Sequence, residues 1–383
     1  MNVVFLDCTQ NYGFQFSAAN TKTELLVKGL VKAGNVCTIM NGVEGYNGIK
    51  HKESRVVNGL GEVVSFPSRK IPVFGFICNL PSLIWALKQL TEKDGNNVMI
   101  LTSPYLHIYF IYVILGKVFG YKIVTISHEW LPTIKRRFWI QNVMAEIYAK
   151  TFGKGIHGLL PISHYILQRV KHFGKPMLMT PILAEYPEKI PSVGKEDIFV
   201  YCVYSYYYRV ITMVIDGYKE YRKMADKPYG LTLILSGPVS QIEKVQDYIR
   251  EAQLAEGITI KTKLPYAELL HAYQQARALL IPLNPGCEQD HARFSQKIAE
   301  YLSSGTPVIS NRVGEIPYYF ENGKNMILTD YSAKGFAKSF KWVQDNPIKA
   351  AEIGKNGFET GVSKFNYETF GKKLDGFLQT MFQ

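Results

Sequence analysis

Short apolar runs alternate with longer segments in which apolar residues recur every three or four positions. The short runs have the length and composition of buried β-strands, and the longer segments have the period of amphipathic α-helices. Such alternation is typical of βαβ units, in which helices cover a parallel sheet. In the first half of the chain, the predicted strands are Val3–Asp7, Cys37–Met40, Val98–Thr102, Ile123–Ser127 and Gly158–Ile162, and the predicted helices include Thr21–Ala33, Leu80–Thr91 and Phe138–Phe152.

The same alternation restarts near residue 195 and predicts a second parallel α/β unit. Between the two patterns, the proline-rich stretch Thr180–Gly194 lacks a helical period and is typical of a linker. With 383 residues, the chain is long enough for two domains. We predict two Rossmann-like, doubly wound parallel-sheet domains that face a central cleft: an N-terminal domain (1–182), a linker (183–194), a C-terminal domain (195–365) and a final helix (366–383) that returns to the first domain.

The second unit is predicted to contain strands Phe199–Val203, Leu231–Ser236, Ile258–Thr262, Ala278–Pro282 and Thr306–Ser310, and helices Ile211–Met224, Gln241–Ala255, Tyr266–Ala276 and Gln296–Ser303.

No segment is expected to cross a membrane. The longest apolar stretch, Tyr105–Gly120, is interrupted by His107 and Lys117 and is too short for a span, so it is interpreted as a buried helix. The first residues, MNVVFLDCTQNYG, are interpreted as a strand, because they lack the basic start of a signal peptide. The five cysteines form no CxxC pair, which disfavours a disulfide framework or a zinc site and favours a reducing, cytoplasmic location.

A net charge of +12 indicates an anionic partner: phosphorylated small molecules, a membrane surface or nucleic acid. Lys135–Ile140, KRRFWI, mixes cations with aromatic residues in a way that suits an anionic membrane surface, and Lys50–Arg55 and Arg69-Lys70 extend the basic character. A solvated basic face explains the same residues equally well. Nucleic acid is disfavoured, because no recognition motif accompanies the charge.

Several cofactor motifs are absent from the sequence. There is no GxGxxG after the first strand and no GxxxxGK[ST], which disfavours a dinucleotide-dependent dehydrogenase and a P-loop enzyme. There is also no DxD to hold a metal ion. We therefore expect neither a bound cofactor nor a metal site.

The stretch Arg293–Ser310, RFSQKIAEYLSSGTPVIS, combines candidate ligand groups with a helix. Gly305 stands where a helix-ending, left-handed residue belongs. Lys297 and Glu300 are three residues apart and share a helix face. The free N–H groups of the first turn suit a diphosphate, Lys297 adds a positive charge, and Glu300 can accept hydrogen bonds from two sugar hydroxyls. A solvated surface pair is the simpler alternative from the spacing alone.

These residues and several others resemble glycosyltransferase family four, whose members have the GT-B fold. The resemblance covers nearly the whole chain and is stronger in the second half. It rests on K-x-x-E-Y-L-x-x-G-x-P-V-I (Lys297–Ile309), Gly314-Glu315-Ile316-Pro317 followed by Glu321-Asn322-Gly323, Leu235-Ser236-Gly237-Pro238, Leu264-Pro265-Tyr266 with Glu268-Leu269, and Leu160-Pro161-Ile162-Ser163.

The resemblance implies roles for residues of the second half. Glu300 would bind the ribose of a nucleotide donor, and Arg209 would be the second of two cations that grip the diphosphate. The first cation's place, near Val203–Ser205, holds no basic residue, and Lys297 is expected to replace its charge. Backbone N–H groups would bind the diphosphate from Phe294, Ser295 and Gln296.

Ala292 departs from the family pattern, because it occupies the place of the first glutamate in the E-x7-E signature. That glutamate normally meets the transferred sugar. Glu288, Asp290 and His291, from the same loop, are candidates to replace it.

In the first half, His128-Glu129 ends a predicted strand. The residues alone favour a structural histidine, whereas the resemblance implies that His128 contacts the transferred sugar and that Glu129 orients it. Gly13 follows the first strand, where a glycine allows close approach of a donor phosphate or sugar; a plain turn glycine fits equally well.

Taken together, the resemblance implies a retaining, metal-independent glycosyltransferase whose first domain binds the acceptor and whose second binds a nucleotide-diphosphate sugar. We expect a saccharide acceptor, carried on a polyprenyl diphosphate lipid, in synthesis of a surface polysaccharide (capsule, O-antigen or exopolysaccharide) or a glycolipid. The expected location is cytoplasmic, on the inner face of the cytoplasmic membrane. Two alternatives stay open: a GT-B sugar-nucleotide epimerase, and an inactive membrane-associated partner of a polysaccharide assembly complex.

Overall fold

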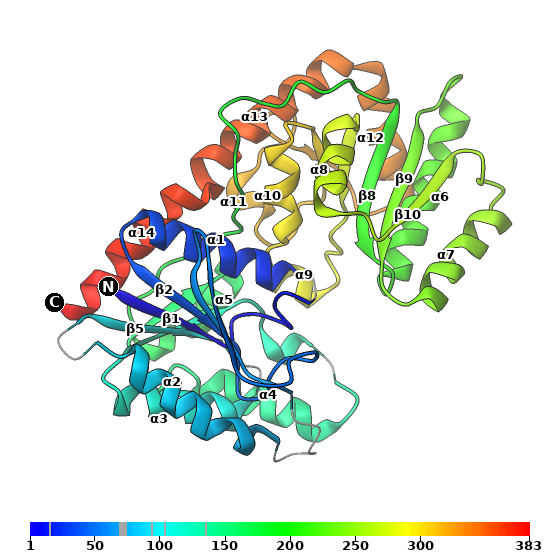
Figure 1. Ribbon diagram of the computed structural model, residues 1–383. Helices are drawn as coiled ribbons and strands as arrows, with labels where there is room; N and C mark the ends of the chain where they lie inside the picture. The colour runs from blue at the N-terminus through cyan, green and yellow to red at the C-terminus, as the bar shows by residue number, and fades with distance from the viewer. Residues whose placement is uncertain (15–16, 69–74, 93–94, 103–104, 135) are drawn as a thin grey trace. The chain divides into compact units, whose positions relative to one another are not determined.

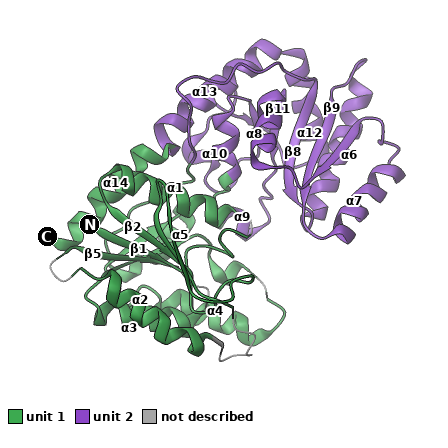
Figure 2. Cartoon of the chain, viewed as in Figure 1, with its two compact units in different colours: residues 1–183, 292–296, 366–383 green, residues 184–291, 297–365 purple. Residues whose placement is uncertain are grey.

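The computed structural model describes residues 1–14, 17–68, 75–92, 95–102, 105–134 and 136–383. The chain forms two compact units, each a parallel sheet with helices on its faces (Figures 1 and 2). Unit 1 comprises residues 1–183, 292–296 and 366–383, and unit 2 comprises residues 184–291 and 297–365.

Unit 1 contains a seven-stranded sheet in the order β3-β4-β2-β1-β5-β6-β7. Neighbouring strands are parallel except at the β3–β4 hairpin, which forms one edge. The central strand β1 is buried along its whole length, as its apolar sequence NVVFL requires. The strands are β1 (Asn2–Leu6), β2 (Val36–Met40), β3 (Glu53–Val57), β4 (Gly61–Ser65), β5 (Asn97–Leu101), β6 (Lys122–Ser127) and β7 (Gly158–Pro161).

The helices of unit 1 lie on both faces of this sheet. The strand order reverses direction after β1, and right-handed crossovers therefore place α1 on one face and α2, α3 and α4 on the other (Figure 1). Helix α14 packs on α1, where Gly29 and Gly371 meet so closely that a Cβ on Gly29 would lie 2.9 Å from the Gly371 Cα. The helices are α1 (Ala18–Lys32), α2 (Leu80–Leu90), α3 (Leu106–Val118), α4 (Trp139–Thr151), α5 (His164–Val170) and α14 (Tyr367–Gln379), with 3-10 turns at Gly75–Asn79, Leu131–Thr133, Lys171–Phe173 and Thr380–Phe382.

Unit 2 contains a six-stranded sheet in the order β10-β9-β8-β11-β12-β13, with every neighbouring pair parallel. Its core joins this sheet to α6 and α12 through buried aromatic and aliphatic side chains, such as Phe199, Tyr221 and Phe340. The strands are β8 (Ile198–Tyr204), β9 (Gly230–Ser236), β10 (Ile258–Thr262), β11 (Ala278–Ile281), β12 (Val308–Ser310) and β13 (Ile327–Leu328).

The helices of unit 2 connect these strands in βαβ fashion. They are α6 (Tyr208–Met224), α7 (Val239–Glu251), α8 (Tyr266–Gln275), α9 (Glu288–Ala292), α10 (Gln296–Ser303), α11 (Ile316–Tyr319), α12 (Ala333–Asp345) and α13 (Pro347–Phe365).

Two segments fall on the other side of the predicted domain boundaries. Residues 292–296 belong to unit 1, because Ser163 Oγ donates to the Ala292 carbonyl at 2.6 Å and the Leu183 backbone N–H donates to the Gln296 side chain at 3.3 Å. Residues 184–194 belong to unit 2, where Tyr186 donates its hydroxyl to the Ala299 carbonyl at 3.1 Å. Side-chain hydrogen bonds between residues distant in sequence are therefore consistent with both assignments.

One helix differs from its predicted environment. The stretch Tyr105–Gly120 forms α3, but the helix is only partly buried, since Ile114 and Val118 are exposed. Apolar residues occur on all sides of α3, so the sequence pattern alone did not distinguish the buried face of the helix from the exposed face. The sequence analysis also missed the β3–β4 hairpin, whose first strand is polar and exposed.

Candidate functional site

Helix α10 is anchored to the unit 2 sheet by one face. Ile298, Ala299, Tyr301 and Leu302 are buried, and the Tyr301 hydroxyl accepts the Cys202 backbone N–H of β8 at 3.2 Å. Gly305 ends the helix with φ +69°, the left-handed conformation that was predicted for it. This packing fixes the orientation of α10, so that the opposite face of the helix points away from the sheet.

Glu300 and Lys297 share the remaining face of α10. Glu300 is only 6% exposed, and burial raises the pKa of its carboxyl to about 7, against the opposing effect of Lys297. Among the described residues, no protein group donates a hydrogen bond to this carboxylate. Buried carboxylates ordinarily have such donors, so Glu300 has acceptor capacity left for a ligand.

The first turn of α10 follows a partly buried loop. Phe294 is buried, and the Gln296 side chain donates to the Leu183 carbonyl and accepts from the Leu183 N–H. The Gln296 side chain is therefore used in holding the Leu183 backbone. An anion at this turn would be bound by backbone N–H groups and not by the Gln296 side chain. The predicted contacts of Phe294, Ser295 and Gln296 with a diphosphate remain predictions.

Arg209 lies in the first turn of α6, with its side chain exposed. The loop before it carries exposed Tyr204 and Tyr206 and no cation, as the sequence indicates. Ser205, in the same loop, has a fully buried hydroxyl for which the described part of the chain offers no partner. In this loop and the first turn of α6, Arg209 is therefore the cation that could bind an anionic ligand.

The short helix α9, which precedes α10, holds the candidates for the missing glutamate. Ala292 is fully buried, so its position presents no polar group. Asp290 accepts the Asn284 backbone N–H at 2.8 Å, and a His291 ring nitrogen lies 2.9 Å from the Pro285 carbonyl, so both side chains brace the loop. Glu288 is exposed. Their contacts with a sugar stay predictions.

In unit 1, His128 directly follows β6. Its Nε2 is shielded from solvent and has no hydrogen-bond partner among the described residues. Burial, together with the positive charge of Lys22, lowers the pKa of His128 to about 3. The imidazole is therefore neutral at physiological pH and retains one unused hydrogen-bonding nitrogen.

The sequence analysis missed Lys22. This lysine is buried on α1, its Nζ donates to the Thr180 carbonyl at 3.1 Å, and burial lowers its pKa to about 7. A lysine inside an amphipathic helix pattern is usually solvated, and the pattern therefore gave no reason to single it out.

Glu129, next to His128, follows the end of β6; part of the residue is exposed to solvent, whereas its carboxyl is largely shielded. Burial of its carboxyl raises the pKa of Glu129, and the nearby guanidinium groups of Arg293 and Arg136 oppose the rise. Among the described residues, Glu129 and His128 form no hydrogen bond with each other, so the predicted role of Glu129 in orienting His128 stays a prediction.

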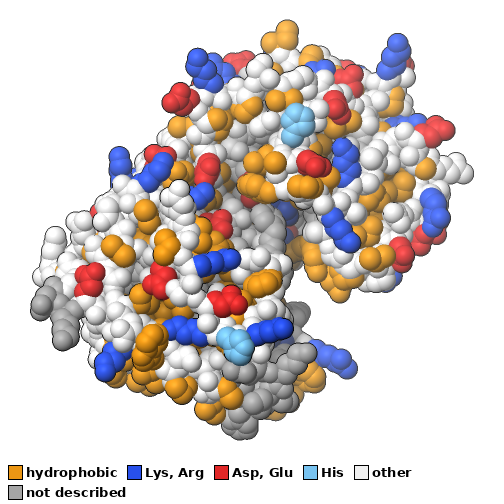
Figure 3. Space-filling view, viewed as in Figure 1, with side chains coloured by type: hydrophobic (Ala, Val, Ile, Leu, Met, Phe, Trp, Pro, Cys, Tyr) orange, Lys and Arg blue, Asp and Glu red, His pale blue; other side chains and the backbone are white. Residues whose placement is uncertain are grey.

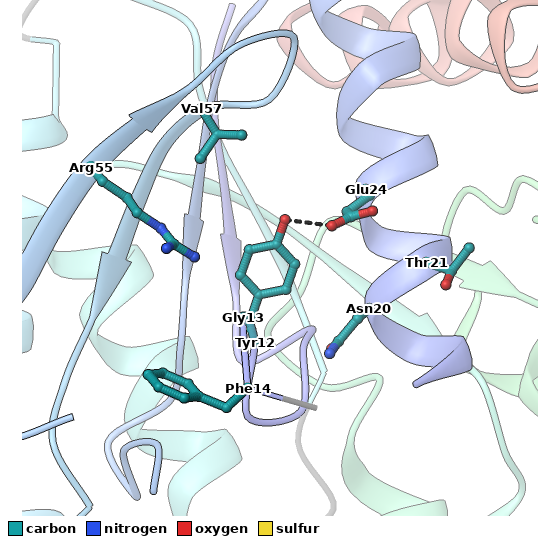
Figure 4. A pocket seen from close by; sticks show the side chains of 8 residues that line it. All are labelled: Tyr12, Gly13, Phe14, Asn20, Thr21, Glu24, Arg55 and Val57. Atoms are coloured by element: carbon teal, nitrogen blue, oxygen red, sulfur yellow. Dashed lines mark hydrogen bonds between the residues drawn. The ribbon is translucent and has the colours of Figure 1, made fainter. Parts of the chain in front are cut away.

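Gly13 lies in the loop after β1 and lines a pocket of about 600 Å³ (Figure 4). Its φ of +86° favours glycine, and a Cβ added there would lie 2.8 Å from Arg55 Nη2. The glycine therefore makes room for a cation. The sequence predicted Arg55 only as part of the basic stretch Lys50–Arg55 and did not predict this pocket.

The described residues contain no group of three or more His, Cys, Asp and Glu side chains placed to hold a metal ion. They also contain no helix that is long and apolar enough to cross a membrane.

Residues 184–360 match the family model described as "Glycosyl transferases group 1". A search of curated proteins finds no significant sequence match. The matched residues include Arg209, Lys297 and Glu300, so the residues predicted to bind a donor lie inside the segment that matches the family model.

Similar solved structures cover nearly the whole chain. Sucrose-phosphate synthase from Thermosynechococcus elongatus is 15% identical with a TM-score of 0.74, and covers 99% of this chain and 98% of its own. A glycosyltransferase from Rickettsia africae is 12% identical with a TM-score of 0.70, covering 100% and 98%. HepE of Anabaena, solved with UDP-glucose, is 12% identical with a TM-score of 0.70, covering 99% of each chain. At such identities the likeness concerns the fold, which is GT-B as predicted.

Proposed function

We propose that this chain, whose residues 184–360 match group 1 glycosyl transferases, moves a sugar from a nucleotide-diphosphate donor to a hydroxyl of a saccharide acceptor. One observation carries the proposal: Glu300 is buried on α10, lacks protein donors in the described residues, and lies one turn from Lys297. Two vicinal ribose hydroxyls supply the donors that this carboxylate lacks. HepE, of the same fold, is solved with UDP-glucose, which supports a nucleotide-sugar donor.

The cations of unit 2 suit stabilisation of a leaving diphosphate. As the bond between the sugar anomeric carbon and the diphosphate oxygen breaks, negative charge grows on the diphosphate. Arg209, Lys297 and the first turn of α10 offset this charge, because fixed cations and N–H dipoles need no reorganisation during the reaction. These groups take the part that a metal ion plays elsewhere, so we propose a metal-independent reaction.

The acceptor oxygen forms the new bond to the anomeric carbon. We propose that it attacks from the side that the diphosphate leaves, so that the configuration is retained, and that the acceptor proton passes to a phosphate oxygen of the departing diphosphate. No protein nucleophile is required by this step. In unit 1, the neutral imidazole of His128 has one nitrogen free to hydrogen-bond a hydroxyl of the transferred sugar.

A lipid-linked acceptor is supported by the helices α2, α3 and α4, which lie on one face of the unit 1 sheet (Figure 1). Folded soluble proteins rarely expose so many large apolar side chains on one layer. Trp139 is 75% exposed and Val118 is 71% exposed. We call this the α2–α4 surface; its exposed apolar side chains are Ile84, Trp85, Ile114, Val118, Phe138, Trp139, Ile140, Val143, Met144 and Ile147.

Lys and Arg side chains lie beside hydrophobic side chains on the face of the molecule that Figure 3 shows. Arg136 and Arg137 precede α4, and Lys52 Nζ lies 3.9 Å from the centre of the Trp85 ring. Aromatic side chains with neighbouring cations suit the headgroup region of an anionic bilayer, where each cation contributes about 1 kcal/mol. The predicted contributions of Lys135 and Arg69-Lys70 lie outside the described residues.

We therefore propose a protein bound peripherally to the inner face of the cytoplasmic membrane, where it extends a polyprenyl-diphosphate-linked saccharide for a surface polysaccharide or glycolipid. The test is transfer of a radiolabelled sugar from UDP-, GDP- and ADP-sugars to membrane lipid extracts and to oligosaccharides. Label in an acceptor product is the expected result. Conversion of a donor sugar without any acceptor would instead favour an epimerase, and donor binding without any transfer would favour an inactive partner.

A further inference from the structure

A pocket formed entirely by unit 1 has no assigned ligand. It is lined from the loop after β1 by Tyr12, Gly13 and Phe14, from α1 by Glu24, and from β3 by Arg55 and Val57 (Figure 4). Its volume of about 600 Å³ lies within the usual range for small-ligand sites. The lining contains a cation, a carboxylate and two aromatic rings, a combination that suits a charged saccharide.

Arg55 is the cation of this pocket. Arg55 and Val57 alternate with Ser54 and Val56 along β3, so both face the same side of the strand. In the described part of the chain, the Arg55 guanidinium has no ion pair and no hydrogen bond. A guanidinium presents its N–H groups in a planar fork that matches a carboxylate or a phosphate.

Glu24 faces the pocket from α1 in a fixed orientation. The Tyr12 hydroxyl donates to Glu24 Oε1 at 2.5 Å, and burial, followed by this hydrogen bond, raises the pKa of the Tyr12 phenol. The second carboxylate oxygen is left to accept sugar hydroxyls. Neighbouring Asn20 and Thr21 are not ligand groups, because their side chains bond the Gln10 and Ser17 backbone.

Phe14 offers an apolar wall. Its ring is 57% exposed, and an exposed aromatic face can pack on the C–H face of a pyranose. The loop that carries it turns through left-handed conformations, with positive φ at Asp7 (59°) and Asn11 (42°) in addition to Gly13. Aspartate, asparagine and glycine are the residues that tolerate this conformation best.

We propose that this pocket binds the acceptor through a sugar unit that bears an acidic group, with the carboxylate or phosphate on Arg55, hydroxyls on Glu24 and the ring on Phe14. The inference rests on the proposed glycosyl transfer: the nucleotide of the donor is assigned to unit 2, so the ligand of a unit 1 pocket is the second substrate. In this proposal, Gly13 contributes to acceptor binding because its missing side chain leaves room for Arg55. The sequence analysis had instead predicted that Gly13 allows close approach of the donor.

The test measures binding of three small probes to the full chain by saturation-transfer NMR titration. The probes are methyl β-glucuronoside, glucose 1-phosphate and methyl β-glucoside. At least one anionic probe should bind about tenfold more tightly than the neutral glucoside, since a charge-assisted pair adds that much. Whichever anionic probe binds more tightly identifies the acidic group as a carboxylate or a phosphate.

Three variants locate the binding. Arg55→Gln should reduce the affinity for the anionic probe to that of the neutral glucoside, and Phe14→Ala should weaken all three probes. Arg250→Gln, an exposed arginine on α7 of unit 2, is the matched control and should change nothing. Circular dichroism melts of each variant check that it is folded.

Equal affinity for the three probes, no binding of any, or anionic binding that survives Arg55→Gln would overturn the pocket assignment. These failures leave the proposed transfer in place as long as a nucleotide still stabilises the protein. Loss of both nucleotide binding and sugar binding would instead contradict the transfer proposal itself.

Discussion

Lys297 and Glu300 lie one turn apart on α10, and the ammonium charge of Lys297 opposes the rise that burial causes in the pKa of the Glu300 carboxyl. The partial compensation leaves a carboxyl that ionises near neutral pH, at about 7. A buried acid in this state is costly to the folded protein and useful to a ligand with hydroxyl donors.

The first prediction concerns stability and pH. The folded-state pKa of Glu300 lies above its unfolded value of 4.5, so stability falls as pH rises through the window from 4.5 to about 7. Glu300→Gln removes this loss. The melting temperature of the variant should therefore exceed that of the parent by more at pH 8 than at pH 5. The corresponding difference in the free energy of unfolding between variant and parent should be larger at pH 8 by about 1–3 kcal/mol. Glu352→Gln, at an exposed position on α13, is the control and should show no such trend.

Arg209→Ala should lower turnover, with a smaller effect on the affinity for the acceptor. A cation at the leaving diphosphate acts mainly in the transition state, and loss of one such group costs about 10²–10³ in rate. Steady-state kinetics with each substrate varied in turn separates the two effects. A change confined to the acceptor Michaelis constant would rule out the leaving-group role.

His128→Gln should reduce kcat/KM by a similar factor at pH 6 and pH 8. With a pKa of about 3, the imidazole is neutral at both values, so the variant loses one neutral hydrogen bond, worth roughly 0.5–1.5 kcal/mol. Initial rates at the two pH values measure the factor. A deficit that grows strongly toward pH 6 would mean that the imidazolium takes part.

Trp139→Ser should weaken binding to anionic vesicles. Cosedimentation with phosphatidylglycerol vesicles is expected for the parent, with little binding to phosphatidylcholine and a decrease at high salt. Ile348→Ser removes an apolar side chain of unit 2 that is 85% exposed, and should leave binding unchanged. Equal binding of all variants, or none to either vesicle, would refute the α2–α4 surface as a lipid contact and favour a protein partner.

The sequence predicted α10 at the observed residues, Gln296–Ser303, because four apolar positions and Gly305 specify the same helix. Most parallel strands were predicted as well, since buried strands have continuous apolar runs, but the short parallel strands β4 and β13 were missed. Local apolar patterns of this kind are sufficient to predict a helix or strand whose buried positions are visible in its own sequence.

Residues whose role depends on distant partners could not be predicted. Arg55 lies on a polar edge strand that has no apolar period, and its neighbour Gly13 comes from another element. Lys22 looks like an ordinary helix lysine until the fold brings it to the Thr180 carbonyl and near His128. The hydrogen bonding of the Gln296 side chain likewise involves Leu183, which is distant in sequence and cannot be identified as its partner from a local pattern.

The central claim is that α10 binds a nucleotide donor, and a thermal-shift titration tests it most directly. Parent, Glu300→Gln and Glu352→Gln would be titrated with UDP, GDP, ADP, CDP and their sugars, since a ligand of the folded state raises the melting temperature. We predict stabilisation of the parent and the control by one nucleotide family, and a loss of about 1–3 kcal/mol in binding for Glu300→Gln. Stabilisation that Glu300→Gln leaves intact, or none with any nucleotide, would contradict the account.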